Sequence, residues 1–228
     1  WLVEFCHKLL DEGIHLNWSL PSGTRSEALD SESLSLLKKT GCNYLVYAPE
    51  SGSLRTLKNI KKKIKLDQLT KSVLEAKRQS LIVRINLIIG FPEETWSDIF
   101  KTVLYGLKMS FYGVDEAPLY IFSPYPGTEI FKTLEQNNKI TLDDDYFFKL
   151  NSLNSSYLST KVVNHNPKIN PRLLGVLRTF FMVANYSVSY IFFPRRIFRT
   201  LKNIFSSHEA ITVFEHRIRD QIQRKKIA

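Results

Sequence analysis

The chain has 228 residues, enough for one sizeable domain with an appendage or for two small domains. Hydrophobic residues make up 43% and charged residues 24%, proportions that exclude an intrinsically disordered chain. The net charge of +10 is confined to one part. Residues 1–160 carry 19 Lys and Arg against 19 Asp and Glu, whereas residues 161–228 carry 13 against 3. A neutral body is therefore followed by a basic tail, which suits anionic partners.

The first residues, Trp1–Leu10, have the pattern of a helix and not that of a signal peptide. Because the chain starts within a helix and without Met, we expect a fragment of a longer protein. Its two cysteines, Cys6 and Cys42, lie far apart and match no metal-ligand spacing. We expect them to be buried, reduced thiols of a cytoplasmic protein.

Strand and helix patterns alternate along the body. Strands are predicted at 14–20, 44–48, 82–89 and 114–122, and helices at 30–41 (capped by Asp30), 66–79, 93–108 and 128–137. Apolar strands that repeat about every 30–40 residues are typical of a parallel sheet covered by helices. The predicted class is α/β, and four strands are too few to close a barrel. The spacing fits either a doubly wound sheet or an incomplete parallel β/α barrel over residues 1–140, and the resemblance given below implies the incomplete barrel. A mainly helical basic tail over 141–228 is predicted to follow.

Loops rich in Gly, Ser, Thr and Pro follow all four predicted strands. They are Pro21–Arg25, Pro49–Ser53, Gly90–Thr95 and Ser123–Thr128. In parallel α/β folds the functional residues lie at the carboxyl ends of the strands. The sequence therefore predicts the site on the face that these four loops form.

Several residues in these loops, or in the segments next to them, are candidates for contacts with a ligand. Glu50 is a carboxylate at a strand end, where it either meets polar groups of a ligand or caps the next helix. The run Lys61–Lys63 is either a solvated charge cluster or the source of an ammonium that reaches a ligand carboxylate. Asn86 lies within an apolar strand, so its amide must be satisfied internally. Gly90 allows close approach of the backbone, and Glu94 either faces a ligand or caps the helix that follows.

Taken together, these motifs resemble the radical S-adenosylmethionine (SAM) superfamily in its methylthiotransferase and cobalamin-dependent branches. The resemblance extends over residues 1–135, and the aromatic run, Pro194 and basic residues of 186–199 resemble the tail of cobalamin-binding members. It rests on Arg25 with Leu29-Asp30, Thr40-Gly-Cys42, Glu50–Ser53, Ile88–Thr95 and Tyr125–Thr128.

The resemblance implies roles for individual residues. Glu50 would contact SAM, Lys62 its carboxylate and Asn86 its ribose. The stretch from Gly90 to Glu94 would lie beside the adenine. The remaining residues that the resemblance places near the ligand are Arg25, Ser51, Phe122 and Ser123.

The resemblance also implies a [4Fe-4S] cluster, at which SAM is reductively cleaved to a 5′-deoxyadenosyl radical. The family's cysteine triplet is absent, so we expect it to precede Trp1 and expect this fragment alone to be inactive. Family members take electrons from a flavodoxin or ferredoxin. The resemblance to the cobalamin-dependent branch implies that the parent enzyme binds cobalamin. The implied reaction is cobalamin-linked methyl transfer or a related carbon–carbon rearrangement. The organic substrate, whether an ordinary small molecule or lipid-like, is not specified.

Two alternatives remain. The chain could be a degenerate, non-catalytic SAM-binding barrel that serves as an interaction module. It could also be an unrelated β/α enzyme that binds a phosphate, but no helix start here is glycine-rich enough to cradle one.

The tail carries two apolar segments. Leu173–Phe193 has the length of a membrane span, but Arg178 and Asn185 make it too polar for one. In the segment 195–205 the apolar residues share one helical face and the cations another. This helix either packs on the barrel with its basic face in water or lies on an anionic membrane as a peripheral contact. Nucleic acid fits less well, because the aromatics form an amphipathic stripe and not a stacking platform.

Overall fold

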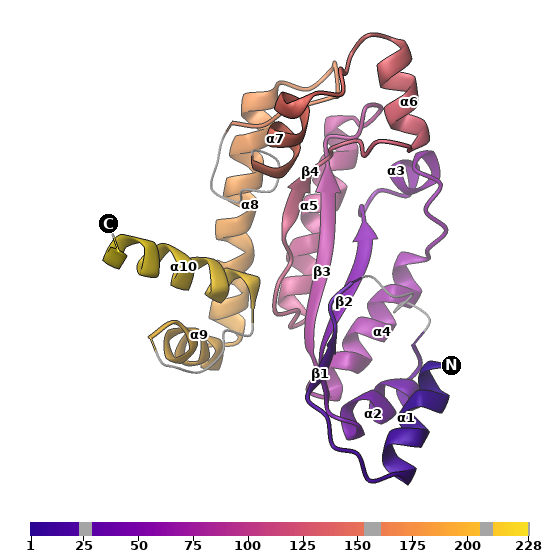
Figure 1. Ribbon diagram of the computed structural model, residues 1–228, viewed down its shortest axis with the longest axis vertical. Helices are drawn as coiled ribbons and strands as arrows, with labels where there is room; N and C mark the ends of the chain where they lie inside the picture. The colour runs from indigo at the N-terminus through magenta and orange to yellow at the C-terminus, as the bar shows by residue number, and fades with distance from the viewer. Residues whose placement is uncertain (23–28, 153–160, 206–211, 228) are drawn as a thin grey trace.

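A computed structural model describes residues 1–22, 29–152, 161–205 and 212–227. Its centre is a sheet of four parallel strands in the order β1-β2-β3-β4, and the sheet does not close into a barrel (Figure 1). The strands are β1 (Trp18–Leu20), β2 (Cys42–Glu50), β3 (Ile82–Ile89) and β4 (Leu119–Ile121). The predicted α/β class and parallel sheet are confirmed.

Helices connect and cover the strands. The body contains α1 (Leu2–Asp11), α2 (Ser31–Lys39), α3 (Leu54–Asn59), α4 (Leu66–Arg78), α5 (Trp96–Phe111) and α6 (Glu129–Gln136). The tail is helical, as predicted, and contains α7 (Asp144–Ser152), α8 (Pro171–Phe192), α9 (Arg195–Phe205) and α10 (Val213–Ile227). Asp30 caps α2 by accepting a hydrogen bond from the Ser33 N–H, as expected. The short helix α3, which Ser53 caps, was not predicted.

The two faces of β3 differ in character. Val83, Ile85, Leu87 and Ile89 are fully buried in the core between the sheet and its helices. The alternate residues, which include Arg84 and Asn86, are half-buried on the opposite face. Because side chains alternate across a strand, this pattern leaves one face of the sheet partly polar. The two cysteines are buried and free, as expected.

The first and last strands are shorter in the structure than predicted. The first was predicted at 14–20, but Ile14 and Leu16 are exposed and only Trp18–Leu20 pairs with β2. The last was predicted at 114–122, but the regular strand is Leu119–Ile121, and before it Glu116 forms only an isolated bridge with Arg84 of β3. Pro118 has no N–H to donate, and the Asp115 carboxylate is turned inward to accept the Val83 N–H.

The tail packs directly on the body. The helix α8 contacts β4 and α5, and its Leu174, Phe181 and Met182 belong to the same core as the sheet. Within the described residues, no single helix is long and apolar enough to cross a membrane. The pair α8 and α9 meets that criterion only when taken together, across a bend of 116°.

The orientation of α9 differs from the predicted packing. We predicted that a packed α9 would turn its basic face to water, but Arg196 is buried, together with Thr200 and Asn203. The apolar residues Phe198 and Phe205 are exposed instead. The reason is that buried carboxylates on the body and on α10 bind the polar side of this helix.

Candidate functional site

The predicted site residues lie along the carboxyl ends of β2, β3 and β4 and in the loops that follow. Parallel pairing brings these ends to one edge of the sheet, so the predicted face exists. Arg25 lies outside the described residues.

Glu50 and Lys62 form a charged pair at the end of β2. Glu50 is the last residue of the strand and has a φ of +64°, in a region that non-glycine residues seldom adopt. Its carboxylate Oε1 lies 3.1 Å from Nζ of Lys62, which follows α3, and both side chains are partly exposed. Capping of α3 is performed by Ser53, so the capping alternative for Glu50 was wrong. An unusual backbone conformation beneath an accessible ion pair is typical of a functional position.

Ser51 faces the interior of the protein. Its side chain is fully buried, and its Oγ lies 2.8 Å from Oγ1 of Thr102 on α5. It also accepts a hydrogen bond from the Ser53 N–H at 3.1 Å. Ser51 therefore fixes the turn between β2 and α3 against α5, and its hydroxyl already has partners within the fold.

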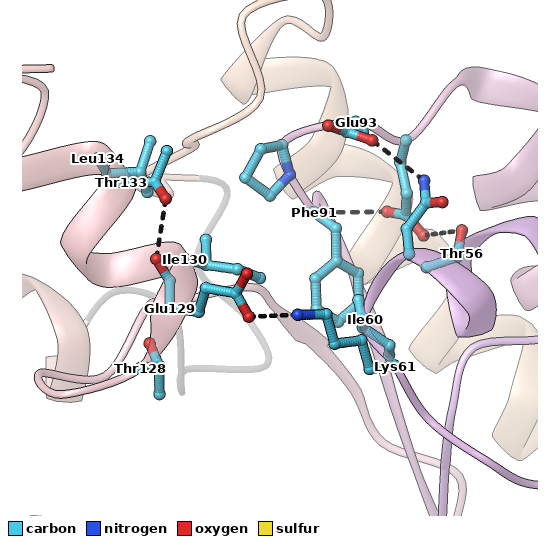
Figure 2. A pocket seen from close by; sticks show the side chains of 13 residues that line it. Thr56, Ile60, Lys61, Phe91, Glu93, Thr128, Glu129, Ile130, Thr133 and Leu134 are labelled. Carbon is cyan, nitrogen blue, oxygen red and sulfur yellow. Dashed lines mark hydrogen bonds and ion pairs between the residues drawn. The ribbon is translucent and has the colours of Figure 1, made fainter.

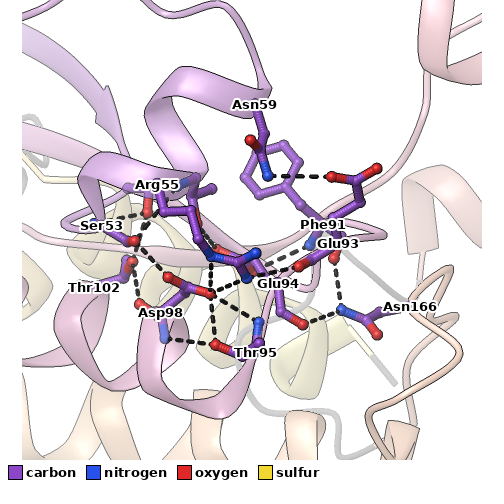
Figure 3. A network of polar contacts seen from close by, with 12 residues as sticks. Ser53, Arg55, Asn59, Phe91, Glu93, Glu94, Thr95, Asp98, Thr102 and Asn166 are labelled. Atoms are coloured by element: carbon purple, nitrogen blue, oxygen red, sulfur yellow. Dashed lines mark hydrogen bonds and ion pairs between the residues drawn. The ribbon is translucent and has the colours of Figure 1, made fainter.

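Asp98 holds the same turn to the start of α5 (Figure 3). Its buried carboxylate accepts hydrogen bonds from Ser53 Oγ at 2.7 Å, Arg55 Nε at 3.1 Å and the Thr95 N–H at 2.9 Å. The hydrogen bond from Arg55 is the main reason that the pKa of Asp98 lies well below its usual range. Sequence reasoning missed Asp98, although Thr95-Trp-Ser-Asp98 has the spacing of a capping box, which the structure confirms.

Glu94 is buried beneath the loop that leaves β3. Its Oε2 accepts hydrogen bonds from the N–H groups of Gly90 (2.7 Å) and Phe91 (3.1 Å), and its Oε1 accepts one from Thr56 Oγ1 at 3.1 Å. Burial raises the pKa of Glu94 to about 7. The helix cap is Thr95, so the capping alternative for Glu94 was wrong. Glu94 instead stabilises the loop by accepting hydrogen bonds from its backbone. Gly90 in this loop has no room for a side chain, because a Cβ there would lie 2.8 Å from Leu174.

The tail reaches the same loop through Asn166, which sequence reasoning also missed. Its Nδ2 donates to the carbonyl oxygens of Phe91 at 2.7 Å and Glu94 at 2.9 Å. No local pattern marks Asn166, because its partners lie more than 70 positions away. The conformation of the β3–α5 loop therefore depends on residues from the tail.

Asn86 belongs to a polar group on the half-buried face of the sheet. Its Oδ1 accepts a hydrogen bond from Arg84 Nε at 2.8 Å, so the expected internal partner exists. Arg84 also contacts the Tyr120 hydroxyl and lies 3.9 Å from the Glu116 carboxylate. The network orients Asn86 on the strand that ends at Gly90.

The last two predicted residues lie just beyond β4. The Phe122 N–H donates to the Ile89 carbonyl oxygen at 2.8 Å, and its ring packs 4.6 Å from that of Phe91. Ser123 is half-buried and lines a small cavity with His165 from the tail. Phe122 thus joins the ends of β3 and β4.

A larger cavity of about 550 Å³ lies among α3, the β3–α5 loop and α6 (Figure 2). Phe91 and Glu94 line it, and Lys61 and Glu129 form an ion pair of 2.5 Å within it. Glu50, Lys62 and Asn86 do not line it. The structure therefore brings Glu50 and Lys62 into direct contact. Glu94 lies beside them only in the sense that it binds Thr56 of α3, the helix between Glu50 and Lys62 in the sequence.

No metal site is present in the part of the chain that the structure describes. Within these ranges no three His, Cys, Asp or Glu side chains are grouped as metal ligands would be. Cys6 and Cys42 are both buried, and burial raises the pKa of Cys42 to about 11, which disfavours the thiolate that a cluster requires. The residues present do not fit an iron–sulfur cluster.

Comparison with known proteins finds similar enzymes. An uncharacterized methyltransferase of Pyrococcus horikoshii is 29% identical over 136 residues, which are 60% of this chain and 28% of the relative. A tRNA-2-methylthio-N(6)-dimethylallyladenosine synthase of Deinococcus radiodurans is 28% identical over 96 residues, 40% of this chain and 18% of the relative. These similarities support the radical SAM resemblance and favour an enzyme.

Comparisons with solved structures and with protein-family models give weaker similarities or none. The solved structure of methylornithine synthase matches 82% of this chain and 49% of that chain, with a TM-score of 0.44 and 17% identity. No protein-family model matches the chain. The chain spans less than a third of the length of either sequence relative.

Proposed function

We propose that this chain is the SAM-binding part of a radical SAM enzyme, with Glu50 and Lys62 as its principal ligand contacts. The observation that carries the proposal is their accessible ion pair at the end of β2. The amino-acid part of SAM carries an ammonium and a carboxylate. A carboxylate and an ammonium 3.1 Å apart on the protein are complementary to both groups.

The surrounding residues have supporting roles in this proposal. Asn86, which Arg84 orients, presents an amide that suits a ribose hydroxyl. The loop from Gly90 to Glu94 is held rigidly by the Glu94 carboxylate, so its backbone is preorganised for the adenine. Bound SAM would supply a sulfonium whose reductive cleavage yields a carbon radical.

We propose that the cluster cysteines lie outside the 228 residues. Two observations support this: the chain has two cysteines, and the residues described provide no metal site. An external electron donor, such as a flavodoxin or ferredoxin, would reduce the cluster. The activity would then require the longer protein.

For the reaction itself, we propose methyl transfer that uses cobalamin. The methyltransferase name of one relative supports it, as does the aromatic and basic sequence of residues 186–199. Addition of cobalamin to the purified full-length protein should give a stoichiometric complex. A protein that binds SAM but no cobalamin would exclude this branch while leaving the SAM site in place.

Calorimetry of SAM binding tests the proposed site. Loss of a charged partner of a bound ligand typically costs about 2–5 kcal/mol, so Glu50→Ala and Lys62→Ala should each weaken binding at least about tenfold. Lys63→Ala is the matched control, because Lys63 is the exposed neighbour of Lys62, and it should leave the affinity unchanged. Equal affinity in wild type and in both site variants would refute the assignment.

A second candidate function is a non-catalytic SAM-binding module. It requires the same Glu50–Lys62 pair but no cluster. In that case SAM would bind through the same two charges but would not be cleaved. Binding alone does not separate the two functions, whereas product analysis does.

A further inference from the structure

The helix α9 attaches to the protein through its polar side. The Arg196 guanidinium donates to the Val114 carbonyl oxygen at 2.9 Å and lies 3.3 Å from the Asp115 carboxylate. Arg199 lies 3.0 Å from the same carboxylate. Asp115 is buried and also binds Lys77 of α4 at 2.5 Å. An ionic network, and not an apolar interface, therefore holds the start of α9.

The second carboxylate of this attachment is Glu215 on α10, which is fully buried. It accepts hydrogen bonds from Thr200 Oγ1 at 3.1 Å and from Asn203 Nδ2 at 3.0 Å. Both partners lie on the same side of α9 as Arg196. Because two buried carboxylates bind the polar side of α9, its apolar side faces outward.

The outward side is an apolar stripe formed by Ile197, Phe198, Leu201 and Phe205 (the α9 stripe). Phe198 is 74% exposed and Phe205 75%. Ile191 and Phe192, at the preceding corner, are exposed as well. An ordinary surface helix buries its apolar stripe and exposes its polar side, so the arrangement here is the reverse. Exposed apolar surface of this kind marks an interaction site.

Charge identifies the partner. Residues 146–208 contain no Asp or Glu, but they contain nine Lys and Arg. Two of these cations, Arg195 and Lys202, are exposed and follow directly beside the α9 stripe around the helix. An apolar stripe bordered by cations is the pattern of a helix that lies in a membrane interface. A second copy of the chain would instead place cations against cations, which is unfavourable.

We propose that the α9 stripe docks the protein peripherally on an anionic lipid bilayer. The aromatic rings enter the boundary between head groups and acyl chains, and Arg195 and Lys202 contact the anionic head groups. The proposal does not depend on the reaction that the protein catalyses. It explains why α9 is amphipathic although the fold uses only its polar side.

The position of the stripe sets the orientation on the membrane. Arg196 binds residues that precede β4, so α9 lies at the amino ends of the strands, whereas the candidate site lies at their carboxyl ends (Figure 1). A docked protein would therefore hold its site away from the bilayer, open to water. Its substrate would arrive from solution and not from the lipid phase.

Vesicle flotation of the full-length protein tests the proposal. Vesicles of phosphatidylcholine with about 30% phosphatidylglycerol should carry the protein upward, and vesicles of phosphatidylcholine alone should do so weakly. Phe198→Ser and Phe205→Ser should each lower the partition coefficient about tenfold, because each removes a ring that the bilayer would bury. Arg195→Ser and Lys202→Ser should each lower it about fivefold.

Control variants test whether vesicle binding depends on the α9 stripe or on any exposed apolar or charged side chain. Phe148→Ser changes another exposed phenylalanine, on α7, and Lys132→Ser changes an exposed cation on α6. Both should bind vesicles like the wild type, and all variants should melt like the wild type because the altered side chains are exposed. Binding that is independent of anionic lipid, or that survives Phe198→Ser with Phe205→Ser, overturns the proposal. Self-association that Phe198→Ser abolishes, without vesicle binding, would assign the stripe to a second copy instead.

Discussion

The Glu94 carboxylate is buried among three hydrogen-bond donors, yet burial raises its pKa to about 7. The folded protein therefore retains this proton to a higher pH than the unfolded chain, whose glutamate has the ordinary pKa of 4.5. The free energy of unfolding consequently falls as the pH rises between these two values. The contribution of Glu94 to stability therefore depends on pH.

Glu94→Gln should remove this dependence. Glutamine keeps an oxygen for the two backbone N–H groups and offers its amide to Thr56. Between pH 5 and pH 8 the wild type should lose about 2–3 kcal/mol of stability relative to the variant. Denaturant unfolding at the two pH values measures this difference. A difference that stays constant with pH would show that Glu94 is ionised throughout.

The sequence placed charged residues at the edge of the sheet, but it did not reveal the contacts of the buried ones. The strand end predicted a ligand-facing position for Glu50, and the resemblance implied one for Lys62. The structure places the two side chains 3.1 Å apart, and their role as site residues stays a prediction. The partners of Glu94 could not be predicted, because Thr56 and Asn166 reach this loop from other parts of the chain. Only the Thr95–Asp98 capping box carried a local signal that was missed.

The elements of the tail depend on buried charges. Asp115 binds Lys77, Arg196 and Arg199, which come from two different helices, and it accepts the Val83 N–H at 3.0 Å. Burial alone would raise the pKa of Asp115, but the charges of Lys77 and Arg196 and the hydrogen bonds from Lys77 and the Val83 N–H lower it. One carboxylate thus joins α4, β3 and α9.

Asp115→Ala should release α9 from the body. Removing one partner of a buried ion pair leaves uncompensated charge and typically costs about 3–5 kcal/mol. Hydrogen exchange should show faster exchange of the α9 amides, while the amides of α2 keep their relative protection. Asp67→Ala is the control, because Asp67 is exposed in the first turn of α4. Unchanged protection of α9 in Asp115→Ala would show that other contacts hold this helix.

The packing of α9 also shows what periodicity can reveal. The pattern of residues 195–205 correctly gave a helix with an apolar and a basic side. The alternative in which α9 packs on the body with its basic side in water was wrong. Asp115 and Glu215 bind that side, and no local pattern reveals their positions relative to α9. Strand lengths failed for a similar reason, since pairing partners and Pro118 limit β1 and β4 more than hydrophobicity does.

For the whole molecule, the spacing of apolar runs was sufficient to predict the parallel sheet. The order β1-β2-β3-β4 follows from strands that alternate with helices, and it places the loops after β2, β3 and β4 at one edge. The division of the chain at residue 140 remains a prediction. Leu174 and Phe181, from the tail, complete the core of the sheet.

We propose that the face formed by the ends of β2 and β3 binds SAM for reductive cleavage. The most direct measurement is the formation of 5′-deoxyadenosine from SAM by the full-length protein, reconstituted anaerobically with iron and sulfide and supplied with a reductant. We expect 5′-deoxyadenosine from the wild type, much less from Glu50→Ala, and the wild-type amount from Lys63→Ala. Binding of SAM without any 5′-deoxyadenosine, in a protein that shows no cluster absorption near about 400 nm, would contradict the proposal and leave a non-catalytic SAM-binding module.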